Sequence, residues 1–180
     1  MSNIFFIADT HWNHSNIIQY CNRPFSNVEE MNKTMIDKWN AKVKTDDIVY
    51  HLGDFGFGDI RSIIKQLNGK IILIVGSHDK NAVTQCKDMF KGIYFGFYEL
   101  RVEDLSITLC HYSLRRWPKS HYGTYHLFGH SHNHLPPFGK SFDIGVDCWN
   151  FEPLSLDEVK IQMDKLPENE NMVKINEKDI

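Results

Sequence analysis

The chain has 180 residues, a net charge of −3 and four scattered cysteines, Cys21, Cys86, Cys110 and Cys148. This length suits one compact domain with a substantial core, and the lack of a basic surplus argues against a protein that grips nucleic acid through its phosphates. No apolar run approaches the ~20 residues that cross a bilayer, and the N-terminus lacks the charged lead of a signal peptide. Cysteines without close pairing fit a reducing compartment, so the sequence predicts a cytoplasmic protein without a membrane partner.

The first half of the chain alternates predicted strands and helices. Apolar runs at 4–8, 48–51 and 71–75 predict strands, each followed directly by a polar loop. Ser26, with Glu29 three residues later, forms a capping-box pattern that begins a helix extending to about Ala41. A second helix is predicted over 60–67. This alternation is typical of α/β proteins.

Strands dominate the second half. The segments 94–102 and 105–110 predict a hairpin that turns at Glu103-Asp104, and 125–128 and 142–146 predict two more strands. A last helix is predicted over 155–163. Together the elements predict one α/β domain over residues 1–165, with a mixed sheet or two packed sheets, and a polar C-terminal tail over 166–180.

Aspartate and histidine follow one predicted strand after another. The segments are Asp9-Thr10-His11, Gly53-Asp54, Gly76-Ser77-His78-Asp79, His111 and Gly129-His130-Ser131-His132. Ligands of α/β sheets bind at the carboxyl ends of the strands, and the glycines are expected to let the backbone turn sharply there. Carboxylate and imidazole groups without cysteine predict a site for Mn, Fe, Ni or Zn.

In this order, the five segments resemble the signature of the calcineurin-like metallophosphoesterases. The family pattern is Asp-x-His, Gly-Asp, Gly-Asn-His-Asp, a single His and Gly-His-x-His, and it is matched over about residues 4–147. The segments 20–25, 51–55 and 145–147 are similar to a compact branch from bacteria and phages. The resemblance implies a four-layer αββα sandwich that binds two divalent metal ions, with Mn²⁺ favoured and Fe, Ni or Zn as alternatives.

The resemblance also implies a role for each matched residue. Asp9, His11 and His132 would bind the first metal, His111 and His130 the second, and Asp54 both. Ser77 replaces the Asn that normally binds the second metal, and its shorter, neutral hydroxyl puts direct ligation in doubt. A hydroxide bridging the metals would attack phosphorus, while His78 contacts the phosphate and protonates the leaving oxygen, with Asp79 orienting its ring.

Several polar residues lie in or beside these loops without a place in the pattern. Four of them are candidates for substrate contact: His14, Asn16, Arg23 and Arg115. Three further histidines are interpreted as solvated or packed side chains: His121, His126 and His134.

We therefore expect a metal-dependent phosphoric ester hydrolase, a phosphodiesterase or phosphatase, whose partner is a small phosphorylated substrate, with a phosphodiester favoured. One alternative is a module that binds metal and phosphate with little or no turnover, because Ser77 weakens the second site. A nuclease is a third interpretation, against which the acidic balance counts.

Overall fold

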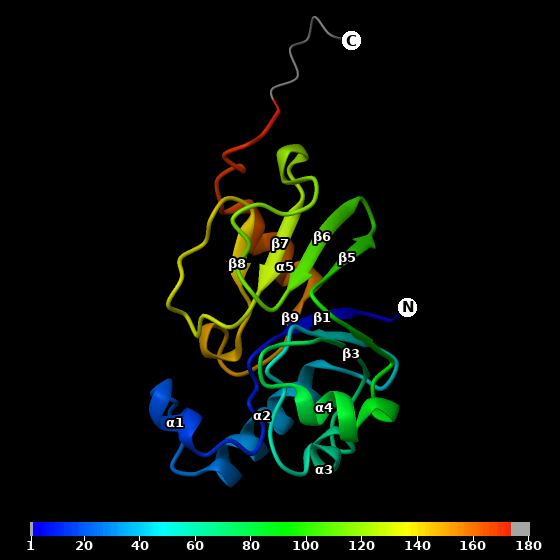
Figure 1. The fold of residues 1–180 in the computed structure, drawn as a ribbon, viewed down its shortest axis with the longest axis vertical. Helices are drawn as coiled ribbons and strands as arrows, with labels where there is room; N and C mark the ends of the chain where they lie inside the picture. Colours follow the sequence, from blue (N-terminus) through cyan, green and yellow to red (C-terminus); the bar gives the residue numbers. More distant parts are fainter. Residues whose placement is uncertain (1, 174–180) are drawn as a thin grey trace, which may run out of the picture.

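The computed structural model describes residues 2–173, which form two β-sheets with helices around them (Figure 1). The first sheet has the strand order β4-β3-β2-β1-β9 and the second the order β5-β6-β7-β8. The strands are β1 (Ile4–Ile7), β2 (Ile48–His51), β3 (Lys70–Ile74), β4 (Gly92–Tyr94), β5 (Phe97–Val102), β6 (Leu105–Cys110), β7 (Tyr125–Phe128), β8 (Ser141–Asp143) and β9 (Leu154–Ser155).

Both sheets are largely parallel, which decides where their loops gather. Strands β1 to β4 run parallel, and β9 pairs antiparallel with β1. In the second sheet β5 and β6 form an antiparallel hairpin, and β6, β7 and β8 run parallel. The carboxyl ends of β1, β2 and β3 therefore share one edge of the first sheet, and those of β6 and β7 share one edge of the second.

Within residues 2–173 the helices are α1 (Asn16–Tyr20), α2 (Val28–Lys42), α3 (Ile60–Ile64), α4 (Lys80–Gln85) and α5 (Leu156–Asp164), with 3₁₀ turns at Lys87–Met89, Ser120–Tyr122 and Val146–Cys148. The cap of α2 lies one residue later than predicted. The Asn27 side chain accepts a hydrogen bond from the Glu30 N–H at 2.8 Å, whereas Ser26 donates its backbone N–H to the Glu30 carboxylate. Among the described residues, no helix is both long and apolar enough to cross a bilayer.

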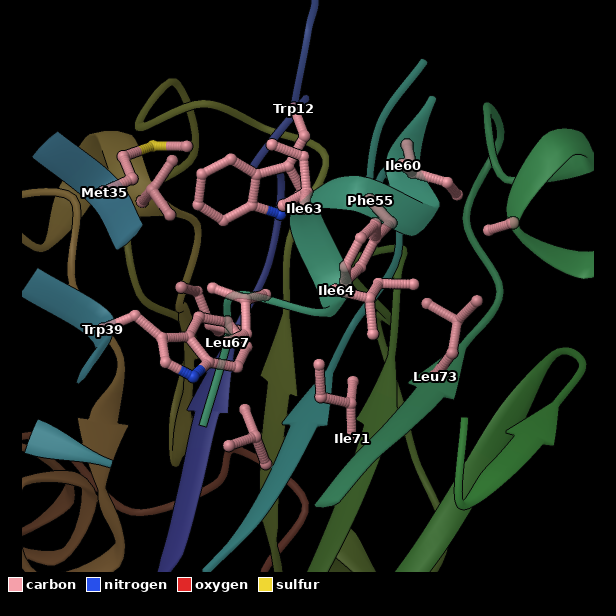
Figure 2. Close-up of a cluster of buried hydrophobic side chains, with 14 of the residues drawn as sticks. Trp12, Met35, Trp39, Phe55, Ile60, Ile63, Ile64, Leu67, Ile71 and Leu73 are labelled. Carbon is pink, nitrogen blue, oxygen red and sulfur yellow. The ribbon is translucent and has the colours of Figure 1, made fainter. Parts of the chain in front are cut away.

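One hydrophobic core lies between the first sheet and α2, α3 and α4 (Figure 2). On α2 the buried residues Met31, Met35 and Trp39 recur every four positions, which places them on one face of the helix. Figure 2 shows Met35 beside Trp12 and Trp39 beside Leu67, all members of the same cluster. The indole N–H of Trp39 donates to the Asn68 carbonyl at 2.8 Å, so this polar group is satisfied inside the core.

A second core joins the opposite face of the first sheet, the second sheet and α5. Strand β1 serves both cores, because alternate residues of a strand point to opposite faces: Phe5 and Ile7 enter the first, and Phe6 the second. From α5, Val159 and Met163 are fully buried in this second core. The predicted α/β sandwich of two packed sheets with flanking helices is confirmed.

The outer face of the second sheet packs against the segment 112–124. Its Trp117 ring lies 5.4 Å from the ring of His126 on β7. The Nδ1 atom of His126 donates to the Thr108 carbonyl at 3.0 Å, and Nε2 accepts the Leu114 N–H at 3.1 Å. His126 is thus a packed structural histidine, as predicted.

Two predicted boundaries are wrong. The segment predicted as one strand over 94–102 is divided: Tyr94 is the last residue of β4 in the first sheet, and β5 of the second sheet begins only at Phe97. The domain also continues past residue 165, because Asn169 is buried and its amide donates to the Ser120 carbonyl at 2.8 Å. Residues 174–180 of the predicted tail lie outside the described part of the chain.

Candidate metal centre

The loops that follow β1, β2, β3, β6 and β7 meet where the edges of the two sheets come together. The Asp9 N–H donates to the Gly53 carbonyl at 3.0 Å, which joins the first two loops. The His130 N–H donates to Asp9 Oδ2 at 2.8 Å, and this bond joins the second sheet to the first. The six Asp and His residues that the sequence predicts as metal ligands are therefore assembled in one place.

These six residues form two groups. In each, one ligand atom per residue lies within 4.8 Å of the others, and the groups are Asp9, His11 and His132, and Asp54, His111 and His130. Asp54 lies between them: its Oδ2 is 3.7 Å from His11 Nε2, and its Oδ1 is 3.5 Å from His111 Nε2. A carboxylate in this position can reach a cation in either group.

The buried polar atoms fit a pair of cations. Buried polar atoms normally have a hydrogen-bond partner. Among the described residues, seven buried side-chain atoms have none, and four of these belong to predicted ligands: Asp9 Oδ1, both ring nitrogens of His11, and His111 Nε2. Burial, followed by the neighbouring His132 and Arg23, lowers the pKa of His11 to about 2, so its imidazole is neutral and can coordinate a metal.

The buried side chains around the site carry an excess of negative charge, which bound cations would neutralise. Five carboxylate side chains are buried here, those of Asp9, Asp54, Asp79, Asp143 and Asp147, whereas Arg23 is the one buried lysine or arginine of the described chain. Burial raises the pKa of Asp9 well above its usual value, and the nearby Asp143 raises it further. Two divalent ions would bring four positive charges, which matches the excess of carboxylates over guanidinium.

The backbone at these positions is strained. Five of the six predicted ligands have a positive φ: 57° at Asp9, 49° at His11, 53° at Asp54, 67° at His130 and 46° at His132. Non-glycine residues in this region cost on the order of 1–3 kcal/mol each and concentrate at functional sites. The fold therefore gives up stability to aim these side chains inward.

A glycine precedes Asp54, Ser77 and His130, and the structure shows why each of these positions needs glycine. Gly53 has a φ of 89°, as a sharp turn requires, but Gly76 and Gly129 do not have a positive φ. A Cβ on Gly129 would lie 2.5 Å from Asp9 Oδ2, and one on Gly76 would lie 2.6 Å from the Asp54 backbone nitrogen. These two glycines are needed for the close approach of neighbouring loops, which corrects their expected role in turning.

Asp79 does not orient the His78 ring, contrary to the prediction. Its buried carboxylate accepts the backbone N–H groups of Asp54 at 2.9 Å, Phe55 at 2.7 Å and Gly76 at 2.7 Å. It thereby ties the loop after β3 to the loop that carries Asp54. His78 itself is exposed at the mouth of the site, and its ring centroid lies 6.1 Å from that of His11.

Ser77 lies against Asp54. Its hydroxyl is 3.2 Å from each carboxylate oxygen and donates to that carboxylate. The neighbouring N–H of His78 also donates to Asp54 Oδ1, at 2.8 Å. Ser77, which stands where the resembled pattern has Asn, thus supports Asp54 by a hydrogen bond in this structure.

Of the four candidates for substrate contact, the structure places one at the site. His14 lines its cavity. Asn16 lines a different hollow beside Ser26 and Glu29, and Arg115 lies over the Phe138 ring, with its exposed guanidinium 3.7 Å from Glu170. Arg23 is buried and makes its hydrogen bonds within the protein. These three residues do not line the cavity, because proximity in sequence does not say where a long side chain points.

Three other residues belong to the site although the sequence pattern did not reveal their role. His134, interpreted as a solvated or packed histidine, lines the cavity. Asp147 accepts a hydrogen bond from the His132 ring at 2.7 Å. Asp143 accepts from the Ser131 hydroxyl and from the Gly145 N–H, and so fixes the loop between His130 and His132. The segment Gly145-Val146-Asp147 is part of the sequence resemblance, which could have marked Asp147 as a candidate, but nothing in the segment indicates a contact with His132.

The site opens into a cavity of about 400 Å³. Six histidines and Asp54 line it, together with Ile17, Tyr20 and Cys21 from α1 and its C-terminal end. None of the described residues that line it is a lysine or an arginine. Negative charge on a ligand would thus have to be met by cations in the two Asp–His groups and by imidazoles.

The chain is similar in sequence or in fold to a few known proteins. The chain is 40% identical over 172 residues to the uncharacterized protein MJ1445 of Methanocaldococcus jannaschii, and the match covers 87% of this chain and 89% of that protein. It is 34% identical over 85 residues to the gene 66 protein of Mycobacterium phage L5, and this match covers 44% of this chain and 41% of the phage protein. The crystal structure of protein AQ665 from Aquifex aeolicus superposes on this structure with a TM-score of 0.71 at 22% sequence identity. The superposition covers 90% of this chain and 100% of AQ665. No family model matches the chain.

The two-sheet sandwich, with Asp and His segments gathered at its strand ends, is the arrangement that the resemblance to the calcineurin-like metallophosphoesterases implies. The chain belongs to the same family as the M. jannaschii protein MJ1445.

Proposed function

We propose that the protein is a phosphoric ester hydrolase that uses two divalent metal ions, Mn²⁺ being favoured, and acts on a small phosphodiester. The observation that carries the proposal is the pair of Asp–His groups with Asp54 between them. When bound, two such ions would lower the pKa of a water molecule and neutralise charge on the phosphoryl oxygens. The protein's part is to hold both positions at the floor of an open cavity.

Several contacts prepare the residues for this task. His111 donates Nδ1–H to the Leu52 carbonyl at 2.8 Å, which leaves its unpartnered Nε2 to face the Asp54 carboxylate. His78 would contact the phosphate and give a proton to the leaving oxygen, because its exposed imidazole lines the cavity while its backbone N–H donates to Asp54 Oδ1. Its ring is free for this role, since the Asp79 carboxylate accepts hydrogen bonds from backbone N–H groups and not from His78.

The lining of the cavity favours a phosphodiester of modest charge. A polyphosphate or a nucleic-acid backbone would ordinarily be met by lysine and arginine, which are absent among the described lining residues. Ile17 and the 70% exposed Tyr20 instead offer an apolar and aromatic wall beside the metal positions. An aromatic or apolar group esterified to the phosphate could rest on this wall, and we propose this as the substrate class.

The proposed location is the cytoplasm. The four cysteines are free thiols in the structure, as a reducing compartment would keep them.

Activity assays after removal of metal by a chelator test the proposal. We expect hydrolysis of bis(p-nitrophenyl) phosphate to return on addition of Mn²⁺, and to be faster than cleavage of duplex DNA. Asp9→Asn should lower the rate at least 10²-fold, whereas the exposed Asp46→Asn, a matched control, should leave it unchanged. Full activity in the presence of chelator would refute a metal-dependent hydrolase. Metal binding without turnover of any phosphate ester would favour the non-catalytic module, and cleavage of duplex DNA alone would favour a nuclease.

A further inference from the structure

A buried ion pair stands directly behind His132. The Asp147 carboxylate accepts from His132 Nδ1 at 2.7 Å through Oδ2. On its other side it pairs with Arg23, whose Nε donates to Oδ1 at 2.8 Å and whose Nη2 donates to Oδ2 at 2.9 Å. The exposed fractions of the two paired side chains are 0% for Arg23 and 7% for Asp147, so water does not compete for these bonds.

Arg23 also contacts the loop that carries the other two residues of the first group. Its Nη2 donates to the Asp9 carbonyl at 2.8 Å, and its Nη1 donates to the Thr10 carbonyl at 3.1 Å. Asp9, His11 and His132 all have a positive φ, so their backbone needs outside support to stay in place. One guanidinium thus braces the loop after β1 directly and the His132 ring through Asp147.

The pair determines the tautomer of His132. A carboxylate paired with a guanidinium can only accept hydrogen bonds, so Nδ1 of His132 carries the hydrogen. Its lone pair is then on Nε2, which is the nitrogen left to bind a metal. Carboxylates that hold metal-binding histidines in this way commonly change metal affinity 10–100-fold when they are removed.

The second group is organised differently, which provides an internal reference. His111 is held by a backbone carbonyl, that of Leu52, and no side chain takes part in that bond. A change of Asp147 or Arg23 should consequently act on the first group and leave the second nearly as it was.

We propose that Asp147 and Arg23 are positioning residues that present Nε2 of His132 to the first metal and set the affinity of that position. The inference rests on the metal binding proposed above. Arg23 is thereby removed from the substrate contacts and becomes part of the support of the metal centre.

Titration of metal-free protein with Mn²⁺, followed by calorimetry, tests the proposal. In Asp147→Asn we expect the binding step of the first group to weaken 10–100-fold and the other step to change less than about threefold. ¹⁵N NMR of metal-free protein should show His132 protonated at Nδ1 in the wild type and as a mixture of tautomers in the variant. Arg61→Met, which breaks an exposed ion pair with Asp88, should change neither readout.

A double variant separates positioning from mere stability. Breaking a buried ion pair by removing one partner is destabilising, but replacing both partners by apolar residues is often close to neutral. Arg23→Met combined with Asp147→Leu should therefore regain thermal stability while its first binding step stays weak. Recovery of the wild-type Mn²⁺ affinity in that double variant, or wild-type binding by Asp147→Asn, would overturn the proposal. A wild-type protein that takes up no Mn²⁺ would instead overturn the proposed function, and this inference with it.

Discussion

At the scale of single residues, Ser77 is where the chain departs from the calcineurin-like metallophosphoesterase pattern that it resembles. The hydroxyl rests on Asp54 at 3.2 Å from both oxygens, which supports the carboxylate from outside the Asp54–His111–His130 group. An asparagine reaches farther from the backbone and offers a carbonyl oxygen, a suitable ligand for Mn²⁺. The second position should thus be the weaker of the two in this chain.

Ser77→Asn should lower the Mn²⁺ concentration that half-fills the second position, by several-fold. The additional oxygen ligand completes a group that otherwise has three protein ligands. Parallel titrations of the two proteins in one buffer measure the effect, and the first binding step serves as the control. Equal second-step affinities would show that the serine is an adequate substitute.

His78 should act on the substrate and not on metal retention. His78→Ala is expected to keep its metal and lose about 10²–10⁴ in rate, the usual range for a general acid. The loss should shrink for substrates with good leaving groups, because these need no proton. Metal analysis and rates on p-nitrophenyl and alkyl diesters measure both effects, with His121→Ala as the control. A His78→Ala protein without metal would contradict this role.

At the scale of the elements, a buried histidine in the second sheet makes the stability of the fold depend on pH. His126 on β7 is buried between the Thr108 carbonyl and the Leu114 N–H. Burial lowers its pKa to about 4, from about 6.5 in an unfolded chain. The unfolded chain therefore binds the extra proton first as the pH falls.

Between pH 6.5 and pH 4 this histidine should remove about 3 kcal/mol from the free energy of unfolding, and its contribution is fully present above pH 6.5. His126→Gln can keep both hydrogen bonds without titrating, so its stability should depend less on pH in that window by about this amount. Denaturant unfolding at several pH values measures the difference, and the exposed His134→Gln is the control. Identical pH dependence in His126→Gln and the wild type would rule out this assignment.

At the scale of the whole molecule, the sequence predicted the strands and the assembly of the site well. Apolar runs that stop at Asp or His mark strand ends, and parallel strands bring those ends together. The ordered blocks thus sufficed to predict the cluster of Asp9, His11, Asp54, His111, His130 and His132 that the structure shows.

What the sequence could not supply are contacts between segments far apart in the chain. Arg23 and Asp147 are separated by 124 positions, and no local pattern says that they pair. The same is true of Asp79, whose carboxylate accepts hydrogen bonds from backbone N–H groups of the loop after β2. The short helix α1, with five residues, has too few turns for a periodic pattern, so the wall it gives the cavity was missed.

If one carboxylate, Asp54, serves two metal positions, the number of metal ions bound per chain should reveal it. Wild-type protein equilibrated with Mn²⁺ should hold two ions per chain, about 3.5–4 Å apart as is usual for two-metal hydrolases, measurable by elemental analysis and by anomalous diffraction from crystals. Asp54→Asn should weaken both binding steps while the fold persists. A single ion per wild-type chain at saturating Mn²⁺, or an Asp54→Asn protein that binds two ions like the wild type, would contradict the account.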